Sequence, residues 1–431
     1  MRYQPLPKEL YIRNRQKLVA QLEEHSMALL CSNDVIPTNA DGVMGFKQNS
    51  DLFYFTGIDQ EETYLILCPN HPKAKFREIL FIRETNEHLK VWEGEKLSKD
   101  QARNLSGIQT VKWSDDIDNF LDKNIDLPCN IYLNSNDHTG RNEDFISETD
   151  QFNKWIKKAF GVKKPKKLAP IFWDLRSIKE EEELVQIKRA VDISRTALIH
   201  FAANLKPDAR EFELEAELTY HFLINRSRGH AFPPIVASGK NACVLHYIGN
   251  NETCKKDDLV LVDFGAEYGN YNADITRCLP VSGKFTKRQK EVYHAVLTVF
   301  KFAKQRLVSG NTMLKLRNEV GKCMENQLIK LGLFTTVDVK NQDAKKPLYR
   351  KYFPHGISHY LGLDVHDVGP PNTTFKPGML FTCEPGIYIP EEGIGIRLEN
   401  DILITKEGNI DLCESIPIEM EEIEALLAAS K

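Results

Sequence analysis

The pattern of apolar and polar positions in residues 1–174 predicts strands that alternate with helices. Leu18, Val19 and Leu22 recur at helical spacing and predict a helix over residues 13–24. Uninterrupted apolar runs of strand length predict three buried strands, at residues 27–32, 63–68 and 78–82. This alternation is typical of an α/β domain.

Two polar or basic segments interrupt this pattern. Residues 48–57 join polar side chains to an aromatic run and end at Gly57, which predicts a loop that leads into a strand. Residues 154–167 contain seven lysines and Pro165. A basic run of this kind is either an address or nucleic-acid patch, or the solvated face of a helix followed by a linker. We favour the helix face and linker, with a domain boundary behind it that gives domains of residues 1–174 and 175–431.

From Ser177 onward the pattern is helical. Ser177 followed by Glu180 predicts a capping box that opens a helix over residues 179–205. The apolar stripe of this helix consists of Leu184, Ile187, Val191 and Leu198. The glutamates at positions 180–183 lie at the positive end of the helix dipole, so they need no functional explanation. A second helix is predicted over residues 211–226.

The second domain shows the same order of elements twice. After the two helices, the first copy has a glycine- and proline-rich stretch with His246 and an apolar strand over residues 259–268. The second copy has helices over residues 287–306 and 313–331, a stretch with three histidines, and a strand over residues 379–388. Chance similarity between two buried strands is the alternative, but four elements in matching order favour an internal duplication with a pseudo-two-fold axis.

Composition excludes several classes of protein. The chain has 431 residues, of which 42% are hydrophobic and 27% charged, which is globular composition with room for two or three domains. A net charge of −4 argues against a nucleic-acid partner. No apolar run reaches the length of a membrane helix, and the N-terminus lacks the apolar stretch of a signal peptide. The nine cysteines include no CxxC pair, so we expect reduced, buried thiols (Cys31, Cys68, Cys383) and a cytoplasmic location rather than structural zinc.

Each copy carries two acids that a buried strand does not explain. Asp263 and Glu384 end the two apolar strands, where a carboxylate is costly unless it is paired or bound to a metal. Asp274 and Glu399 follow them after 11 and 15 residues, on the next strand patterns. If the two copies are related by a pseudo-two-fold axis, the four carboxylates meet at that axis.

Residues 355–367 hold His355, His359 and His366 among glycines and apolar residues. Histidine is the commonest metal ligand and also moves protons near neutral pH, although buried histidines satisfied by hydrogen bonds are equally common. Four carboxylates and one neutral imidazole carry four negative charges, which two divalent cations neutralise. Oxygen-rich ligation with one histidine suits Mn²⁺, Co²⁺ or Fe²⁺, whereas a structural zinc site would be rich in cysteine.

These ligands, in chain order, resemble the metal site of the pita-bread metallopeptidases, a family that includes methionine aminopeptidases, prolidases and Xaa-Pro aminopeptidases (aminopeptidase P). The five positions are Asp263, Asp274, His359, Glu384 and Glu399. Further segments are similar to aminopeptidase P, namely residues 48–57, 355–369, 384–388, 395–401 and 422–426. The resemblance covers both domains, which disfavours a methionine aminopeptidase. It implies an α/β (α+β) chain with an N-terminal creatinase/RNase H-like domain and a C-terminal pita-bread domain.

The resemblance also implies a reaction. Two divalent metal ions, with manganese expected and cobalt, iron or zinc as alternatives, would share a hydroxide that attacks the Xaa-Pro bond. Asp263 would bind one ion through both oxygens, Asp274 and Glu399 would bridge the two ions, and His359 and Glu384 would complete the other metal site.

Other residues take supporting parts by the same resemblance. Glu384 is the expected proton shuttle to the departing nitrogen. His246 and His366 would hydrogen-bond the substrate carbonyl and the oxyanion, and His355 would face the proline ring. Arg397 would orient one of the bridging acids. A solvent-facing strand histidine and a surface arginine are the plain alternatives for His246 and Arg397.

The first domain offers Asp41 and Trp92 as residues of the cleft rim. The resemblance implies that this domain helps to close the cleft and to build a homodimer or homotetramer, in which Asp41 approaches a neighbouring subunit's site. An exposed aspartate and a structural tryptophan are the alternatives.

Three functions remain open from the sequence. The leading prediction is a metal-dependent Xaa-Pro aminopeptidase, which removes the first residue from peptides with proline at the second position. A prolidase shares the metal site but needs a group that reads the free carboxylate of a dipeptide, and the sequence identifies none. A non-catalytic module that binds peptides or histones belongs to another class, and its ligand positions would be degraded, whereas all five are intact here.

Overall fold

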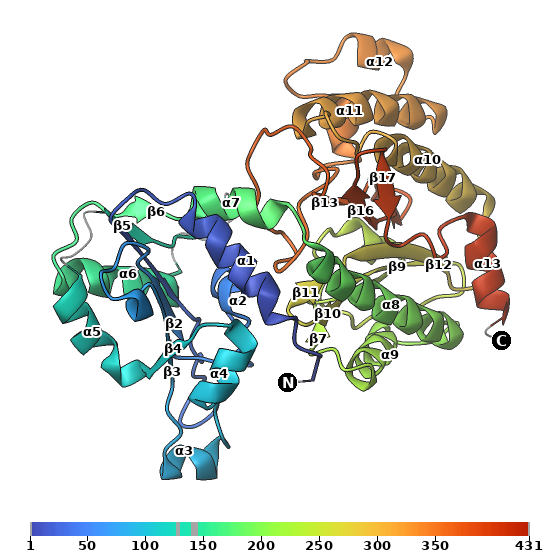
Figure 1. Cartoon of the computed structure of the whole chain (residues 1–431). Coiled ribbons are helices and arrows are strands. Elements are labelled where there is room, and N and C mark those ends of the chain that lie inside the picture. The colour runs from blue at the N-terminus through green and yellow to red at the C-terminus, as the bar shows by residue number, and fades with distance from the viewer. Residues whose placement is uncertain (1, 126–129, 139–144, 430–431) are drawn as a thin grey trace. The chain divides into compact units, whose positions relative to one another are not determined.

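The computed structural model describes residues 2–125, 130–138 and 145–429, which form two compact units (Figure 1). The N-terminal unit comprises Gln4–Arg176 and Val368–Pro370. The C-terminal unit comprises Arg2, Tyr3 and the chain from Ser177 onward, apart from residues 368–370.

A six-stranded mixed sheet lies at the centre of the N-terminal unit, in the order β4-β3-β2-β1-β5-β6. Its strands are β1 (Ser26–Cys31), β2 (Tyr64–Leu67), β3 (Glu78–Ile82), β4 (Thr110–Trp113), β5 (Asn130–Leu133) and β6 (Lys166–Lys167). The pairs β1–β2 and β2–β3 are antiparallel, and the other three pairs are parallel. The three strands predicted from apolar runs are confirmed as β1, β2 and β3.

Helices cover both faces of this sheet (Figure 1). On one face, α5 (Ile117–Asn124) and α6 (Glu148–Ala159) bury Phe120, Phe152 and their neighbours against strand residues such as Phe81. On the other face, α1 (Lys8–Val19), α2 (Ser50–Thr56) and α4 (Lys99–Ser106) pack together, and α2 contacts β1 and β2. Two further helices are α3 (Glu87–Trp92) and α7 (Ala169–Ser177). The expected α/β character of the first domain is confirmed.

Residues 48–57 form helix α2, so the prediction of a loop that leads into a strand was wrong. The Asn49 side chain caps the helix by accepting from the backbone N–H groups of Asp51 and Leu52. Gly57 ends it in the left-handed conformation, with φ of 66°. Every residue from Leu52 to Thr56 is buried, and a helix that is apolar on all sides shows no 3.6-residue pattern in its sequence.

Two other boundaries differ from the expectation. The helix predicted over residues 13–24 is α1, which begins after Pro7 and ends before Leu22. The predicted linker contains β6, whose residues Lys166 and Lys167 pair in parallel with Tyr132 and Leu133 of β5. The lysines of α6 are exposed, as predicted for a solvated helix face.

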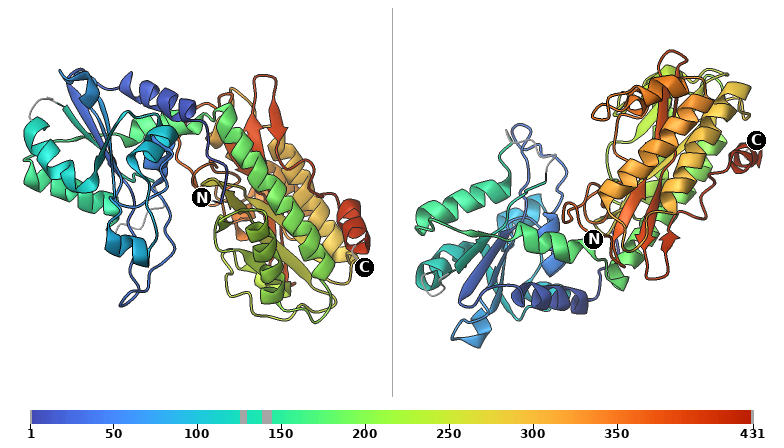
Figure 2. Two further views of the ribbon diagram at one scale, coloured as in Figure 1. Left: turned by 60° about the horizontal axis from the view of Figure 1, so that its bottom comes forward. Right: turned by 90° about the horizontal axis from the view of Figure 1, so that it is seen from above.

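Four long helices form two packed pairs in the C-terminal unit (Figure 2). They are α8 (Glu181–Asn204), α9 (Glu211–Ile224), α10 (Lys287–Lys304) and α11 (Met313–Lys330), and two shorter helices are α12 (Thr336–Lys340) and α13 (Met420–Ala429). All four predicted helices are confirmed, and the predicted apolar stripe of α8 is buried. The cap of α8 is not Ser177 but Glu180, which forms a capping box with Glu183.

Short antiparallel strands pack beneath these helices. They are β7 (Gly229–His230), β8 (Ile235–Ser238), β9 (Leu259–Phe264), β10 (Ala266–Tyr268), β11 (Tyr271–Asn272), β12 (Ile275–Pro280), β13 (Leu380–Cys383), β14 (Gly386–Ile389), β15 (Ile394–Arg397), β16 (Asn400–Ile404) and β17 (Asn409–Asp411). Both strands predicted as continuous are therefore broken in two. At the first break the backbones approach so closely that a Cβ on Gly265 would lie 1.7 Å from the carbonyl oxygen of Ala273.

The two copies pair their strands in the same way, which confirms the internal repeat. In the first copy β9 pairs with β12 and β10 with β11. In the second copy β13 pairs with β16 and β14 with β15. An antiparallel bridge between Thr276 and Glu399 joins the copies to each other.

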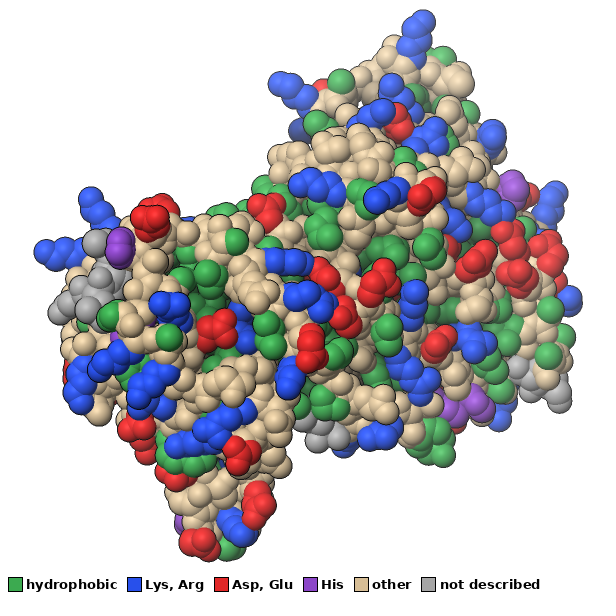
Figure 3. Space-filling model, in the orientation of Figure 1, with side chains coloured by type: hydrophobic (Ala, Val, Ile, Leu, Met, Phe, Trp, Pro, Cys, Tyr) green, Lys and Arg blue, Asp and Glu red, His purple; other side chains and the backbone are tan. Residues whose placement is uncertain are grey.

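The state of the cysteines and the mix of surface charges are as expected from the composition. Eight free cysteines lie among the described residues, and Cys31, Cys68 and Cys383 are buried. No helix within the described ranges is both long and apolar enough to cross a membrane. On the face drawn in Figure 3, lysine and arginine side chains are interspersed with aspartate and glutamate.

Candidate metal centre

The four predicted acids lie where strands of the C-terminal unit end or break. Asp263 is the last residue but one of β9, and Asp274 lies between β11 and β12. Glu384 follows β13, and Glu399 lies between β15 and β16. Asp263, Asp274 and Glu399 are buried. In each copy, the acids lie where the chain passes from one antiparallel strand pair to the other. Their side chains line one cavity.

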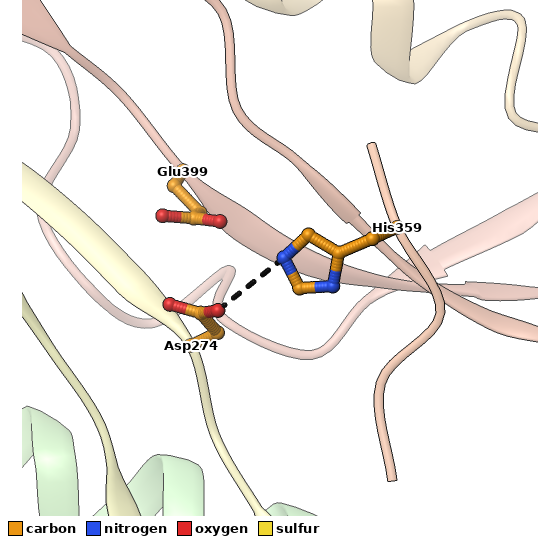
Figure 4. Close-up of side chains that lie close together, drawn as sticks. All are labelled: Asp274, His359 and Glu399. Carbon is orange, nitrogen blue, oxygen red and sulfur yellow. Dashed lines mark ion pairs between the residues drawn. The ribbon is translucent and has the colours of Figure 1, made fainter. Parts of the chain in front are cut away.

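Asp274, His359 and Glu399 form the tightest group (Figure 4), with one possible ligand atom of each within 4.8 Å of the others. The His359 Nε2 atom lies 3.5 Å from Asp274 Oδ2 and 3.7 Å from Glu384 Oε1. Residues from both copies, 85 to 125 positions apart, therefore meet at one point.

The ring of His359 is held in the orientation that a metal ligand needs. Its Nδ1 atom lies 2.9 Å from the carbonyl oxygen of Tyr360. Since a carbonyl oxygen only accepts, Nδ1 carries the proton, and in the neutral ring the lone pair of Nε2 faces the carboxylates.

Asp263 lies beside Arg397, whose Nη2 donates to Asp263 Oδ2 at 2.6 Å. The other oxygen, Asp263 Oδ1, is buried and has no hydrogen-bond partner. Arg397 also donates to Tyr388 Oη at 2.8 Å and to Thr276 Oγ1 at 3.1 Å. Its direct acidic partner is thus Asp263, and Thr276 connects it to Glu399. The expected role of Arg397 in orienting a bridging acid stays a prediction.

Sequence reasoning missed three residues that hold this group in place. The hydroxyl of Thr276 donates to Glu399 Oε2 at 2.6 Å, and Asp401 Oδ2 accepts from the backbone N–H of Asp274 at 3.3 Å. The hydroxyl of Tyr388 lies between Arg397 and His355 Nε2, at 2.8 Å from each. The sequence offered a hint for Tyr388, because the two predicted strands each end in a tyrosine. It offered none for Thr276 or Asp401.

Burial and mutual repulsion raise the pKa values of Asp274 and Glu399. Burial raises the pKa of Asp274 well above its ordinary value, and the charges of Asp263 and Asp401 raise it further. Burial and the charge of Asp274 likewise raise the pKa of Glu399. For Glu384, burial acts in the same direction, but the nearby imidazoles of His355 and His359 together lower its pKa.

The donor set fits divalent cations. Four carboxylates gathered in a buried site repel one another, one buried oxygen has no partner, and one imidazole presents a lone pair to the group. Oxygen donors with a single histidine suit hard or intermediate divalent ions, and cations would relieve the repulsion that raises the pKa values of Asp274 and Glu399.

A cavity of about 590 Å³ opens above the acids. All five expected ligands line it, together with His246, His355, His366 and Arg397. The rings of His359 and His366 lie 4.3 Å apart between centroids. Apolar side chains of Phe232, Ile235, Leu245 and Val365 complete much of the wall, so the cavity combines an apolar surface with a few convergent polar groups, as ligand sites do.

Asp41 and Trp92 belong to the N-terminal unit. Both side chains are exposed there, and Trp92 closes the short helix α3 with 71% of its surface accessible. Their predicted place at the rim of a cleft stays a prediction.

Comparison with known sequences identifies the family. Residues 185–406 match Metallopeptidase family M24, and residues 11–132 match the aminopeptidase P N-terminal domain. The chain belongs to metallopeptidase family M24. Within this M24 family it combines the two domains of the aminopeptidase P group, which confirms the predicted fold and class of hydrolase.

Relatives of the chain are similar over their whole length. The Xaa-Pro aminopeptidases of Escherichia coli K12 and Haemophilus influenzae are 33% and 32% identical to it, over 99% and 98% of each chain. The structure of E. coli aminopeptidase P with the inhibitor Pro-Leu matches with a TM-score of 0.88 at 32% identity, over 99% of each chain. Such full-length similarity does not favour the prolidase or binding-module alternatives.

Proposed function

We propose that this M24 chain removes the first residue from peptides whose second residue is proline. The observation that carries the proposal is the group of four carboxylates and one oriented imidazole at the cavity, with the buried Asp263 Oδ1 left without a partner. Full-length relatives that are named Xaa-Pro aminopeptidases support the choice of substrate.

Two divalent cations, for which we propose Mn²⁺, would be held by Asp263, Asp274, His359, Glu384 and Glu399. Bound ions of this kind lower the pKa of water to make a nucleophile at neutral pH, and they polarise a carbonyl oxygen. The four carboxylate charges equal the charge of two such ions, which supports this number.

Glu384 is the residue best suited to carry a proton to the leaving group. Its Oε2 lies 3.4 Å from His355 Nδ1 and its Oε1 3.7 Å from His359 Nε2. Because these imidazoles lower its pKa, the carboxylate is ionised near neutral pH and can accept a proton. The nitrogen of an Xaa-Pro bond has no hydrogen, so it must gain a proton before it leaves as an amine.

Three histidines at the cavity would bind the substrate. His246 and His366 are exposed and can donate to the carbonyl oxygen and to the negative charge that it develops. His355 is held by Tyr388 Oη and packs edge-on against Phe353, with centroids 4.7 Å apart. A ring fixed in this way offers a wall for the proline ring.

A free dipeptide carboxylate finds little to bind in this cavity. Among the described residues that line it, Arg397 is the only arginine or lysine. Each nitrogen of its guanidinium group already donates, to Thr276, Tyr388 and Asp263. This arrangement favours peptides longer than a dipeptide.

The test is an assay after chelation, with Mn²⁺, Co²⁺, Fe²⁺ or Zn²⁺ added back singly. We expect release of arginine from Arg-Pro-Pro, no turnover without metal, and highest activity with Mn²⁺. Turnover of Arg-Pro alone would show a prolidase, and a normally folded protein that binds no divalent ion would show a binding module.

We also propose that the protein is cytoplasmic and forms a homodimer or homotetramer, in which Asp41 of one subunit approaches the site of another and Trp92 lies at the cleft rim. Buried free thiols support the reducing compartment. Light scattering on the purified protein tests the assembly. The activities of Asp41→Ala and Trp92→Ala are then measured at protein concentrations at which the subunits are associated and at which they are dissociated, which tests the shared site.

A further inference from the structure

A buried ion pair lies beneath the loop that carries His366. Asp367 is the next residue, and its Oδ2 accepts from Lys179 Nζ at 2.9 Å. Each of the two side chains is only 1% exposed. Lys179 comes directly before the cap of α8, and its backbone N–H donates to the carbonyl oxygen of Gly378 at 2.8 Å. The pair therefore ties the histidine loop to the start of α8 and to the segment before β13.

The same loop is clamped from its other side by Asn272, two residues before Asp274. The backbone N–H and the side-chain amide of Asn272 both donate to the carbonyl oxygen of Gly362, at 3.0 Å each. The amide also donates to the carbonyl oxygen of Leu363 at 2.9 Å. The loop closes on itself where Asp367 N–H donates to the carbonyl oxygen of Tyr360 at 2.9 Å.

The fit around the ion pair is tight. A Cβ on Gly362 would lie 2.3 Å from Asp367 Oδ2 and 2.8 Å from Lys179 Nζ. The loop can approach the pair so closely only because residue 362 has no side chain. Asp367 is buried while its neighbour His366 is exposed at the cavity, so a shift of the Asp367 backbone would also move the backbone that carries His366.

A buried ion pair is a poor device for stability alone, because desolvation offsets most of the attraction and an apolar pair of similar volume often does as well. What the pair adds is position, because a buried carboxylate that leaves its ammonium partner becomes an uncompensated buried charge, which is costly. Asp367 Oδ2 is therefore held at Lys179 Nζ, and this restrains the backbone that carries His366.

We propose that Lys179 and Asp367 are positioning residues of the reaction, which hold His366 in line with the substrate oxygens. The inference rests on the proposed function, in which His366 donates to those oxygens. A displacement of about 1 Å at a positioned group costs on the order of 100-fold in rate, and this sets the expected size of the effect.

Two variants separate positioning from stability. Asp367→Asn keeps the shape and removes the charge that Lys179 Nζ meets at 2.9 Å. The double variant Lys179→Met/Asp367→Leu removes both charges and keeps apolar packing. We expect both to lower kcat about 100-fold with KM changed by less than about threefold, while the double variant keeps a Tm close to that of the wild type. Recovery of kcat together with Tm in the double variant would overturn the proposal.

A double-mutant cycle with His366 tests the route of the effect. If Asp367 acts through His366, adding Asp367→Asn to His366→Ala lowers kcat by less than about twofold. A further loss of about 100-fold in the His366→Ala background would show that the pair acts elsewhere.

The wild type decides whether the proposed function itself fails. A wild-type protein that does not cleave Xaa-Pro peptides would refute the proposed function. The positioning of His366 by Asp367 would then still be tested by comparing structures. Crystal structures of wild type and Asp367→Asn should show the His366 ring turned away from the cavity in the variant, and an unchanged ring would overturn the inference.

Discussion

Glu183 should make the stability of the C-terminal unit depend on pH. This side chain lies in the first turn of α8 and is 1% exposed. It accepts from the backbone N–H of Glu180 at 2.9 Å and from Tyr271 Oη at 3.0 Å. Burial raises its pKa from 4.5 to about 7, against the opposing effects of Lys179 and these hydrogen bonds, while the charge of Asp367 raises it further.

The size and sign of the effect follow from this shift. A rise from 4.5 to about 7 at about 1.4 kcal/mol per pKa unit gives about 3 kcal/mol. Because the folded state binds this proton more tightly than the unfolded state, the stabilisation is complete below pH 4.5. It is lost as the pH rises from 4.5 to about 7 and stays lost above that pH.

Glu183→Gln removes the titration and should remove this pH dependence. The matched control is Glu181→Gln, an exposed glutamate in the same turn. All four tryptophans lie in the N-terminal unit, so tryptophan fluorescence would report on the wrong unit. Native-state hydrogen exchange of the α8 amides measures the correct one.

The expected result is a difference between wild type and Glu183→Gln that changes by about 3 kcal/mol from pH 4.5 to 7. The hydrogen bond that glutamine cannot accept adds an offset that does not vary with pH. A difference that stays constant across this range, or an equal change in Glu181→Gln, would refute the reasoning.

Four further results are expected. Asp274→Asn and Glu399→Gln should each abolish peptidase activity and lower the metal content measured by atomic emission, and wild-type turnover without metal would contradict this. His246→Ala should lower kcat more than it raises KM, because a bond to the developing oxyanion strengthens in the transition state; a change in KM alone would refute that role. Gly362→Ala should cost about 1–3 kcal/mol by overpacking against Asp367, seen as a lower Tm. Mn²⁺ at 100 times its dissociation constant should raise the free energy of unfolding by about 3 kcal/mol per site, and a Tm that metal does not change would argue against binding.

The repeat and its acids could be predicted from sequence because each leaves a local pattern. An apolar strand that ends in an acid is conspicuous in one dimension, and two such strands in matching surroundings suggest a shared axis. The strand breaks themselves were not predictable. The first break lies where Gly265 lets its backbone approach Ala273, a contact between hairpin arms that no single run of residues shows.

The partners of charged residues were harder to predict, since they lie far apart in the chain. Arg397 and Asp263 are 134 positions apart, and Lys179 and Asp367 are 188 apart. Each pair is specified by the packing of the folded chain, and Arg397 and Lys179 taken alone resemble ordinary surface charges. The prediction for helix α2 was wrong for a local reason. Residues 52–56 are all buried, so the helix lacks the polar face by which a helix is recognised in a sequence.

The duplication also bears on which of two corresponding acids, Asp263 or Glu384, transfers a proton. Corresponding residues of the two copies meet near the axis, so Asp263 and Glu384 occupy comparable places at the ends of β9 and β13. Asp263 is held by Arg397 at 2.6 Å, and a guanidinium group keeps its charge at every physiological pH. Glu384 lies instead within 3.4 and 3.7 Å of His355 and His359, and each imidazole ring has two nitrogens that can hydrogen-bond. The Asp263 oxygen that faces Arg397 already accepts from the guanidinium group, whereas Glu384 faces two imidazoles, whose nitrogens can both donate and accept a proton. We therefore expect proton transfer to belong to the second copy, and Glu384→Gln to lose it while the negative charge of Asp263 stays in place.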